Sequence, residues 1–406
     1  MSTKIQIFIL LLLLSAGSYA QQANIQGKDT ATTRNPVTSA VPFLAITPDA
    51  RSGGMGDIGV AISPDANGAY WNPAKMAFID QSMGFAISYT PWLGKIVNDM
   101  NLAYLSGFYK ITREQTISAS FRYFDLGDIQ FTDNFGEELN LFRPREYAVS
   151  VNYSRLLSET LSLGLTGRFL VSNLTGDFTT SAGETNPAVG AAADIGIYYH
   201  TDLFLGGREH ELTLGGVISN IGPKITYTDE NNRDFIPTNF RVGAAWKTYL
   251  DPYNSFTFGV DVNKLMVPTP PVYQLDSTGQ IIFDAAGNPQ VAEGKDPNRG
   301  LINGMFGSFN DAPGGFSEEL KEFTVSAGVE YWYNEAFAAR FGYFHEHEDK
   351  GNRKYFTFGL GFRYQVFGLD FAYLVARQQE HPLAETLRFT LIFNFEDRQQ
   401  EETITD

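Results

Sequence analysis

From residue 83 onward, apolar side chains alternate with small or polar ones along the chain. In the segment 355–364, YFTFGLGFRY, the even-numbered positions include Phe356 and Phe358, and the odd-numbered positions include Thr357 and Arg363. Successive side chains of a β-strand point to opposite faces of its sheet. The alternation therefore predicts a strand with one apolar face and one small or polar face.

The same division recurs through the rest of the chain and predicts fourteen strands. Most segments have about ten residues or more, which is the length that a tilted strand needs to cross a bilayer. They are expected at residues 83–90, 99–110, 115–126, 145–155, 160–172, 188–200, 210–219, 238–249, 254–263, 322–334, 336–346, 354–365, 367–377 and 385–396.

The connections between these segments alternate in length. Those after even-numbered strands are short, such as ITRE and LLSE, and TDLFLGGRE is the longest of them. Those after odd-numbered strands are mostly longer, and include 127–144, 173–187, 220–237 and the insert 264–321. Tight periplasmic turns and large external loops are typical of outer-membrane barrels.

A soluble β-sandwich also has alternating strands, but it has no reason to keep every second connection short. In lipid, all backbone polar groups must be paired, so a sheet there has to close. The sequence thus predicts an all-β protein, a 14-stranded antiparallel transmembrane β-barrel in the outer membrane of a Gram-negative bacterium.

Composition and motifs narrow the function classes. The formal net charge of −16 argues against nucleic acid as a partner, and the absence of cysteine removes disulfides and thiolate sites. His345 and His347 lie in HEHEDK, but a metal site would need further ligands, so a solvated loop is expected. No nucleophile elbow or phosphate loop occurs. We therefore expect no catalytic residues, no metal and no cofactor, and a protein that is not an enzyme.

The two ends of the chain have compositions of their own. Lys4, a short apolar run and Ser18-Tyr19-Ala20 indicate a secretory signal peptide, because the run is too short to span a membrane. We expect both termini of the mature chain in the periplasm, with the polar arm either lying there or leading into the barrel. The expected divisions are a signal peptide at 1–20, the arm at 21–45, a hatch or plug inside the lumen at 46–82, the barrel at 83–396 and an acidic periplasmic tail at 397–406.

The insert 264–321 interrupts the strand pattern with Pro and Gly and predicts an irregular or small hairpin excursion with a short helix near Ser317–Lys321. It carries four large apolar residues on the side expected to be external, namely Met305, Phe306, Phe309 and Phe316. Apolar side chains on an exposed loop indicate a partner-binding surface. The alternative is that they pack on the barrel mouth or on one another.

By the alternation, several charged side chains point into the barrel. Buried ions of both signs usually pair with one another or with a plug, and the alternative is a polar pathway through the lumen. The residues are Arg168, Arg241, Lys247, Asp261, Glu330, Arg363, Asp370 and Arg388.

The segment 53–77, GGMGDIGVAISPDANGAYWNPAKMA, matches neither a helix nor a strand period. Glycine and alanine let a backbone pass close to a wall of side chains, so the segment suits a plug ahead of the first strand. Its order of residues, carried by Gly54, Gly56, Asp65, Asn72 and Pro73, resembles the N-terminal hatch of the FadL family of fourteen-stranded transport barrels. The wording AVPFLAITPDARSGGMGDIGVA more closely resembles one branch, the PorV family of outer-membrane shuttle proteins in the Bacteroidetes type IX secretion system.

The resemblance implies a function that composition does not. Such proteins are not enzymes. They bind the C-terminal signal domain of cargo, associate with the large translocon barrel and pass cargo to an attachment complex containing a sortase-like protease. Two alternatives remain: a FadL-like channel for long-chain fatty acids or other hydrophobic small molecules, and a structural barrel that braces a neighbour.

Overall fold

The computed structural model describes residues 34–93, 99–132, 138–174, 179–180, 183–227, 233–285, 287–377 and 386–395. The expected signal peptide at 1–20, the first part of the arm and the acidic tail at 397–406 lie outside these ranges.

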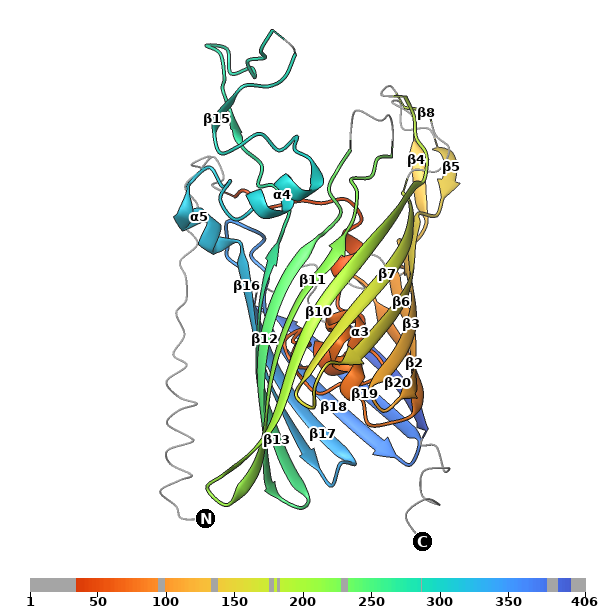
Figure 1. Cartoon of the computed structure of the whole chain (residues 1–406). Coiled ribbons are helices and arrows are strands. Elements are labelled where there is room, and N and C mark those ends of the chain that lie inside the picture. Colours follow the sequence, from red (N-terminus) through yellow and green to blue (C-terminus); the bar gives the residue numbers. More distant parts are fainter. Residues whose placement is uncertain are drawn as a thin grey trace, which may run out of the picture. The chain divides into compact units, whose positions relative to one another are not determined.

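Fourteen antiparallel strands form a closed barrel, which confirms the predicted fold (Figure 1). Consecutive strands pair around the ring, and β1 completes it by pairing with β20, with Ile87 opposite Leu391. The barrel strands are β1 Met83–Pro91, β2 Asn101–Thr112, β3 Gln115–Asp125, β6 Arg145–Leu156, β7 Leu161–Asn173, β10 Ala188–Leu205, β11 Arg208–Ile221, β12 Asn239–Asp251, β13 Asn254–Leu265, β16 Phe323–Tyr333, β17 Phe337–His345, β18 Lys354–Tyr364, β19 Phe367–Ala376 and β20 Leu387–Phe395.

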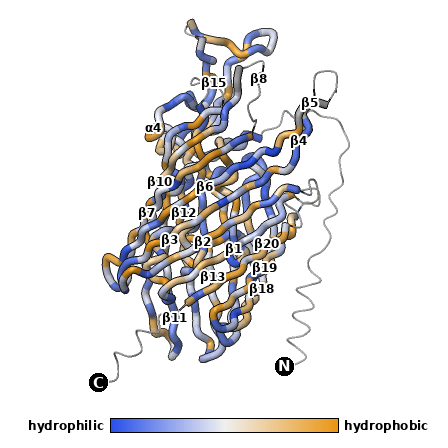
Figure 2. Tube along the Cα trace, turned by 90° about the vertical axis from the view of Figure 1, so that its right-hand side faces the viewer, coloured by the Kyte–Doolittle hydropathy of each residue, from blue (hydrophilic) through white to orange (hydrophobic). Residues whose placement is uncertain are grey.

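The two faces of each barrel strand have different surroundings, as the sequence predicts. Phe358 points outward and is 49% exposed, whereas Thr357 points inward and is fully buried. Outward aromatic side chains meet across strands, as in the stacked rings of Phe85 and Phe393 at 4.8 Å. Figure 2 shows hydrophobic and hydrophilic residues interleaved along the strands. No helix in the described ranges is long and apolar enough to cross a membrane.

The connection predicted at 201–209 is much shorter than expected. Strand β10 continues to Leu205 and β11 begins at Arg208, so only Gly206 and Gly207 form the turn. Both glycines have positive φ, 60° and 78°, which a two-residue turn of this kind requires. The alternation in TDLFL is therefore a continuation of the strand, not a loop.

The long connections carry small elements at one end of the barrel (Figure 1). The insert 264–321 contains a short hairpin and two short helices, the second of which agrees with the helix expected near its end. These elements are the pairs β4 Ile129–Thr132 with β5 Glu138–Phe142, β8 Thr179–Thr180 with β9 Gly183–Glu184, and β14 Val272–Tyr273 with β15 Val291–Glu293, and the helices α4 Leu301–Gly307 and α5 Phe316–Lys321.

The chain ahead of β1 crosses the inside of the ring. The Asn35 N–H donates to the Asp349 carbonyl at 2.8 Å and the Ala40 N–H to the Phe235 carbonyl at 2.9 Å, which places residues 34–40 among the long connections. At its other end, the Ser82 carbonyl accepts from Lys110 beside a short turn. Of the two expected positions for the arm, the described part therefore leads into the barrel and does not lie beside the short turns.

Four short helical elements lie along this crossing: η1 Pro42–Ala45, α2 Ala50–Gly53, α3 Gly68–Trp71 and η2 Pro73–Phe78. Their apolar side chains pack against the inward-facing side chains of the strands. Phe43 and Leu44 form a core with Leu102 and Leu170 near the long connections, and Met76 and Ile79 form another with Ala86. The core of the protein thus sits between the crossing segment, which we call the hatch segment (residues 40–79), and the barrel wall.

Candidate functional site

Glycines stand on both sides of the closest approach between the hatch segment and the wall. The Gly56 N–H donates to Thr357 Oγ1 at 2.7 Å, and Gly56 has a φ of 75°. A Cβ on Gly342 would lie 2.0 Å from the Gly56 nitrogen, and a Cβ on Gly54 would lie 2.9 Å from the Gly359 Cα. Backbone passes against backbone here, which only glycine allows.

The Asn72-Pro73 pair of the motif begins η2 and joins it to the barrel wall at β10. The Asn72 side chain accepts a hydrogen bond from the Ala74 N–H at 3.0 Å and so begins η2, with Pro73 at its first position. Its amide donates to the Ile197 carbonyl at 3.0 Å and the Val60 carbonyl at 3.3 Å. One buried amide therefore orders both the hatch segment and its contact with β10.

A buried ion network joins the hatch segment to strands β16 to β19. Glu330 accepts from Arg51 at 2.8 Å and from Arg340 at 2.6 Å. Arg51 also pairs with Asp65 of the hatch motif at 3.1 Å, and Arg340 pairs with Asp370 at 2.8 Å. Each charge in this network has a partner of opposite sign, which lowers the cost of keeping it out of water.

The other predicted inward charges also lie inside the barrel, and most have a partner. Asp261 accepts hydrogen bonds from the Gly59 and Val60 N–H groups at 2.7 and 2.9 Å. The remaining ion pairs are Arg363 with Asp370 at 2.7 Å, Arg388 with Asp57 at 3.2 Å, Arg168 with Asp194 at 2.8 Å and Lys247 with Glu211 at 2.9 Å. Arg241 is different, because no carboxylate of a described residue lies within ion-pair distance of it.

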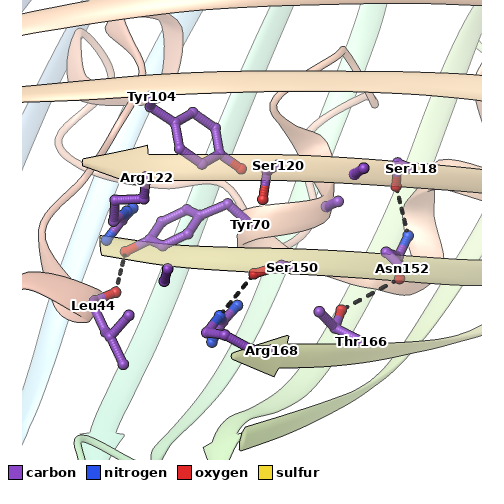
Figure 3. Close-up of a pocket in the computed structure, with 13 residues that line it drawn as sticks. Leu44, Tyr70, Tyr104, Ser118, Ser120, Arg122, Ser150, Asn152, Thr166 and Arg168 are labelled. Carbon is purple, nitrogen blue, oxygen red and sulfur yellow. Dashed lines mark hydrogen bonds between the residues drawn. The ribbon is translucent and has the colours of Figure 1, made fainter. Parts of the chain in front are cut away.

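Arg241 and Arg122 flank one aromatic residue of the hatch segment. Their guanidinium carbons lie 5.4 and 4.5 Å from the centre of the Tyr70 ring. Figure 3 shows Tyr70 beside Arg122 and Tyr104, at a cavity of only about 20 Å³, which is room for about one water molecule. Burial alone would raise the pKa of the Tyr70 phenol, but the positive charges of the two arginines have the larger effect, so this pKa lies below its usual value.

A larger cavity of about 630 Å³ lies on the long-connection side of Tyr70 and Trp71. Aromatic side chains from the hatch segment and from the wall line it, including Phe43, Trp92, Phe124 and Phe344. Its polar lining includes Arg241, Asn239 and Asn263.

Ion pairs hold the insert 264–321 on the rim of the barrel. Lys264, with a fully buried side chain, pairs with Glu319 at 3.2 Å and with Glu322. Lys350, from the connection between β17 and β18, pairs with Glu322 at 3.0 Å and with Glu318 of α5. Helix α5 is thereby fixed to the wall.

The four apolar residues expected on the insert do not share one environment. Phe306 and Phe316 are 61% and 76% exposed. Phe309 is partly covered, because its ring lies 6.2 Å from Phe240 on the strand below. Met305 fits the alternative, in which these side chains pack within the protein, because only 2% of it is exposed. Met305 therefore supports the insert and is not available to a partner.

Sequence reasoning missed Arg51, Arg340 and Asp57. Arg340 occupies an inward-facing position of β17, so the same alternation that predicted Arg363 could have predicted it. Arg51 and Asp57 lie in the aperiodic hatch segment, where no such signal exists. The described residues contain no group of three potential metal ligands.

A model of the family described as "Type IX secretion system protein PorV" matches residues 29–272, more than half of the chain. The chain belongs to the PorV family. It is therefore an outer-membrane component of the type IX secretion system, and the resemblance carried by the residue 53–77 motif is confirmed. The match ends at the start of the large insert.

Several solved barrels are similar to this chain. They include a FadL homologue from Pseudomonas aeruginosa, with 11% identity over 89% of this chain and 100% of that chain and a TM-score of 0.48. The toluene transporter TbuX from Ralstonia pickettii has 12% identity over 86% and 98% of the two chains, with a TM-score of 0.46. The toluene transporter TodX from Pseudomonas putida has 10% identity over 84% and 95%, also with a TM-score of 0.46. No curated protein matches the sequence.

Proposed function

We propose that this chain is a non-enzymatic carrier of the type IX secretion system. It binds the C-terminal signal domain of cargo proteins, associates with the large translocon barrel and delivers cargo to the sortase-like attachment complex at the cell surface. The family match over residues 29–272 carries the proposal.

The hatch segment supports a binding role over conduction. Arg51 joins it to Glu330, Asp57 joins it to Arg388, and the two N–H groups of Gly59 and Val60 join it to Asp261. These contacts involve three strands of the wall, β13, β16 and β20. In this proposal the segment plugs the lumen, so that partners meet the barrel at the end that carries the long connections.

The exposed apolar side chains of the insert are where we place partner binding. Phe316 stands on α5, which Lys264 and Lys350 fix to the rim, and Phe306 stands on α4, which buries its neighbour Met305. Large aromatic side chains on a rigid support lose little conformational freedom when they are covered, and such residues often dominate the affinity of an interface.

The test is to replace both phenylalanines by aspartate and to measure capture of cargo signal domain and of the translocon barrel in mild detergent. We expect capture of at least one partner to fall by about ten-fold or more. Phe283→Asp is the matched control, because Phe283 is 57% exposed in the same insert but lies between β14 and β15 and not on a helix. Heat-modifiable migration of each variant shows that the barrel is folded. Undiminished capture of both partners by the double variant would remove the insert from the binding surface.

The orientation of the barrel is a separate part of the proposal. Because the chain has no cysteine, single cysteines can be introduced at Arg34, among the long connections, and at Glu159, in a short turn. With the long connections outside, the start of the described arm is external, in contrast to the periplasmic N-terminus expected from the sequence, and a membrane-impermeant maleimide added to intact cells labels R34C but not E159C. The reverse result would invert the barrel and overturn the external placement of the insert.

A second candidate function is a FadL-like channel for long-chain fatty acids or other hydrophobic small molecules. The aromatic cavity of about 630 Å³ favours it. In that case deletion of the gene would abolish uptake of a long-chain fatty acid and leave protein secretion normal. The carrier function predicts the opposite pair of results.

A further inference from the structure

Resting on the proposed carrier function, we propose that the cavity above Tyr70 and Trp71 binds the free C-terminal end of a cargo polypeptide, with its α-carboxylate on Arg241. The occupant is thus a terminal peptide segment and not a folded domain. Cargo proteins that differ in sequence share this one group at the end of a C-terminal signal.

The charge of the cavity supports an anionic occupant. Its cationic lining residues other than Arg241 are already neutralised: Arg388 by Asp57, Arg353 by Glu346 and Lys350 by Glu318 and Glu322. Arg241 is only 6% exposed, its Nε atom has no hydrogen-bond partner, and no described carboxylate pairs with it. Asp261 is near enough to interact electrostatically with Arg241, but its carboxylate already accepts hydrogen bonds from the Gly59 and Val60 N–H groups. A buried guanidinium without a paired carboxylate is costly, and a ligand carboxylate would supply both the ion pair and the hydrogen bonds.

The surroundings of Arg241 are preorganised. Its guanidinium stands over Tyr70 and Trp71 at 5.4 and 5.3 Å, and Trp71 is itself held by a hydrogen bond from its indole N–H to Asp49 at 2.8 Å. Stacking on aromatic rings and fork-shaped pairing with a carboxylate are both arginine properties that lysine lacks.

The remaining lining suits a polypeptide. Asn263 lies opposite Arg241 in the strand register, and its side-chain oxygen has no partner, so it is free to accept a peptide N–H. Asn239 adds a second amide, and the aromatic wall covers apolar side chains. A volume of about 630 Å³ lies in the range of pockets that hold small ligands, roughly 300–1,000 Å³, which admits a chain end but no domain.

The experiment compares two forms of one dansyl-labelled peptide with the sequence of the end of a cargo protein secreted by the same organism. One form has a free C-terminal carboxylate and the other a C-terminal amide. Binding to the purified full-length chain in detergent is followed by fluorescence anisotropy. We expect the acid to bind about ten-fold tighter than the amide, as a charge-assisted bond in a buried site would give.

Variants connect that difference to Arg241. Arg241→Gln should bind acid and amide alike, and Arg241→Lys should restore part of the preference. Lys247→Gln is the matched control, because Lys247 is also an inward-facing cation but pairs with Glu211 and does not line the cavity, and it should keep the preference. Heat-modifiable migration again reports folding. Equal binding of acid and amide by the unaltered chain, or an unchanged preference in Arg241→Gln, would overturn the assignment.

Two further arms separate the possible failures. Dodecanoate that binds at Arg241 while the peptide does not would replace the polypeptide by a fatty acid as the occupant, and so overturn the proposal. If the whole signal domain is captured but its C-terminal amide form is captured equally well, the carrier function stands and the cavity assignment fails. If no signal domain is captured at all, the carrier function fails first.

Discussion

Two groups of buried arginines in the barrel differ in one respect. Arg51 and Arg340 share Glu330, and further carboxylates complete their pairing. Arg122 and Arg241, which both lie beside the Tyr70 ring, have no carboxylate partner among the described residues.

The difference separates two uses of buried charge. Around Glu330 the charges cancel within the protein, so the network holds the hatch segment to the wall. Around Tyr70 the positive charge is left over beside a cavity, where a group from outside the chain would complete it. A protein that must hold one segment permanently and another reversibly needs both arrangements.

The largest expected effect comes from removing the centre of the paired network. Glu330→Ala leaves Arg51 and Arg340 buried without their shared carboxylate, which we expect to cost about 3–5 kcal/mol. The thermal transition of the barrel, followed by heat-modifiable migration, should fall markedly. If the hatch segment also loosens, conductance in planar bilayers should rise.

The control for that experiment is Glu209→Ala, because Glu209 is exposed beside a short turn. It should change neither the transition nor the conductance. An unaltered transition in Glu330→Ala would show that the paired network does not hold the hatch segment. The paired arginines and the arginines beside Tyr70 would then not have the different roles inferred above.

A smaller effect is expected at the glycine contact next to the paired network. A Cβ on Gly342 would lie 2.0 Å from the backbone nitrogen of Gly56, so Gly342→Ala must displace the hatch segment. Overpacking of this kind costs about 1–3 kcal/mol. The matched control is Gly167→Ala on β7, where a Cβ meets nothing within 4 Å. Equal thermal transitions for the two variants would mean that the hatch segment is not tightly apposed to the wall.

The barrel could be predicted from sequence because its physics is periodic. A strand in lipid has two faces, so each residue reports its own orientation, and even Arg340 carries that signal. The prediction failed at 201–209 because Asp202 and the glycines are typical of turns, although the alternation runs through to Leu205.

The site could be predicted only in part. The alternation placed Glu330 and Arg241 inside the barrel but could not distinguish a paired ion from an unpaired one, since partners come from other strands and from the hatch segment. The hatch segment itself consists of helical elements of four to six residues, too short to leave a period. Met305 shows the same limit in the insert: its chemistry matches that of Phe306, and only the packing of α4 tells them apart.

The smallest effect is expected at the rim, where charge is paired but close to water. Burial alone would raise the pKa of the Glu318 carboxyl, but hydrogen bonds from Lys350 and from the Gly314 N–H hold it below its usual value of 4.5. A carboxyl with a lowered pKa stabilises the native state above its unfolded pKa, and this contribution is lost as the pH falls through the native pKa. We expect a loss of about 0.2–1 kcal/mol, seen as lower amide-exchange protection in α5, relative to the intrinsic rate at each pH, when the pH drops below about 4.5. Glu318→Gln, which has no such proton to gain, should exchange faster at neutral pH and lose this pH response.

If the unaltered chain and the variant respond alike to acid, then the insert is held by Lys264 and its two glutamates. The charges of the rim would then resemble the permanently paired network around Glu330 and not the unpaired arginines beside Tyr70.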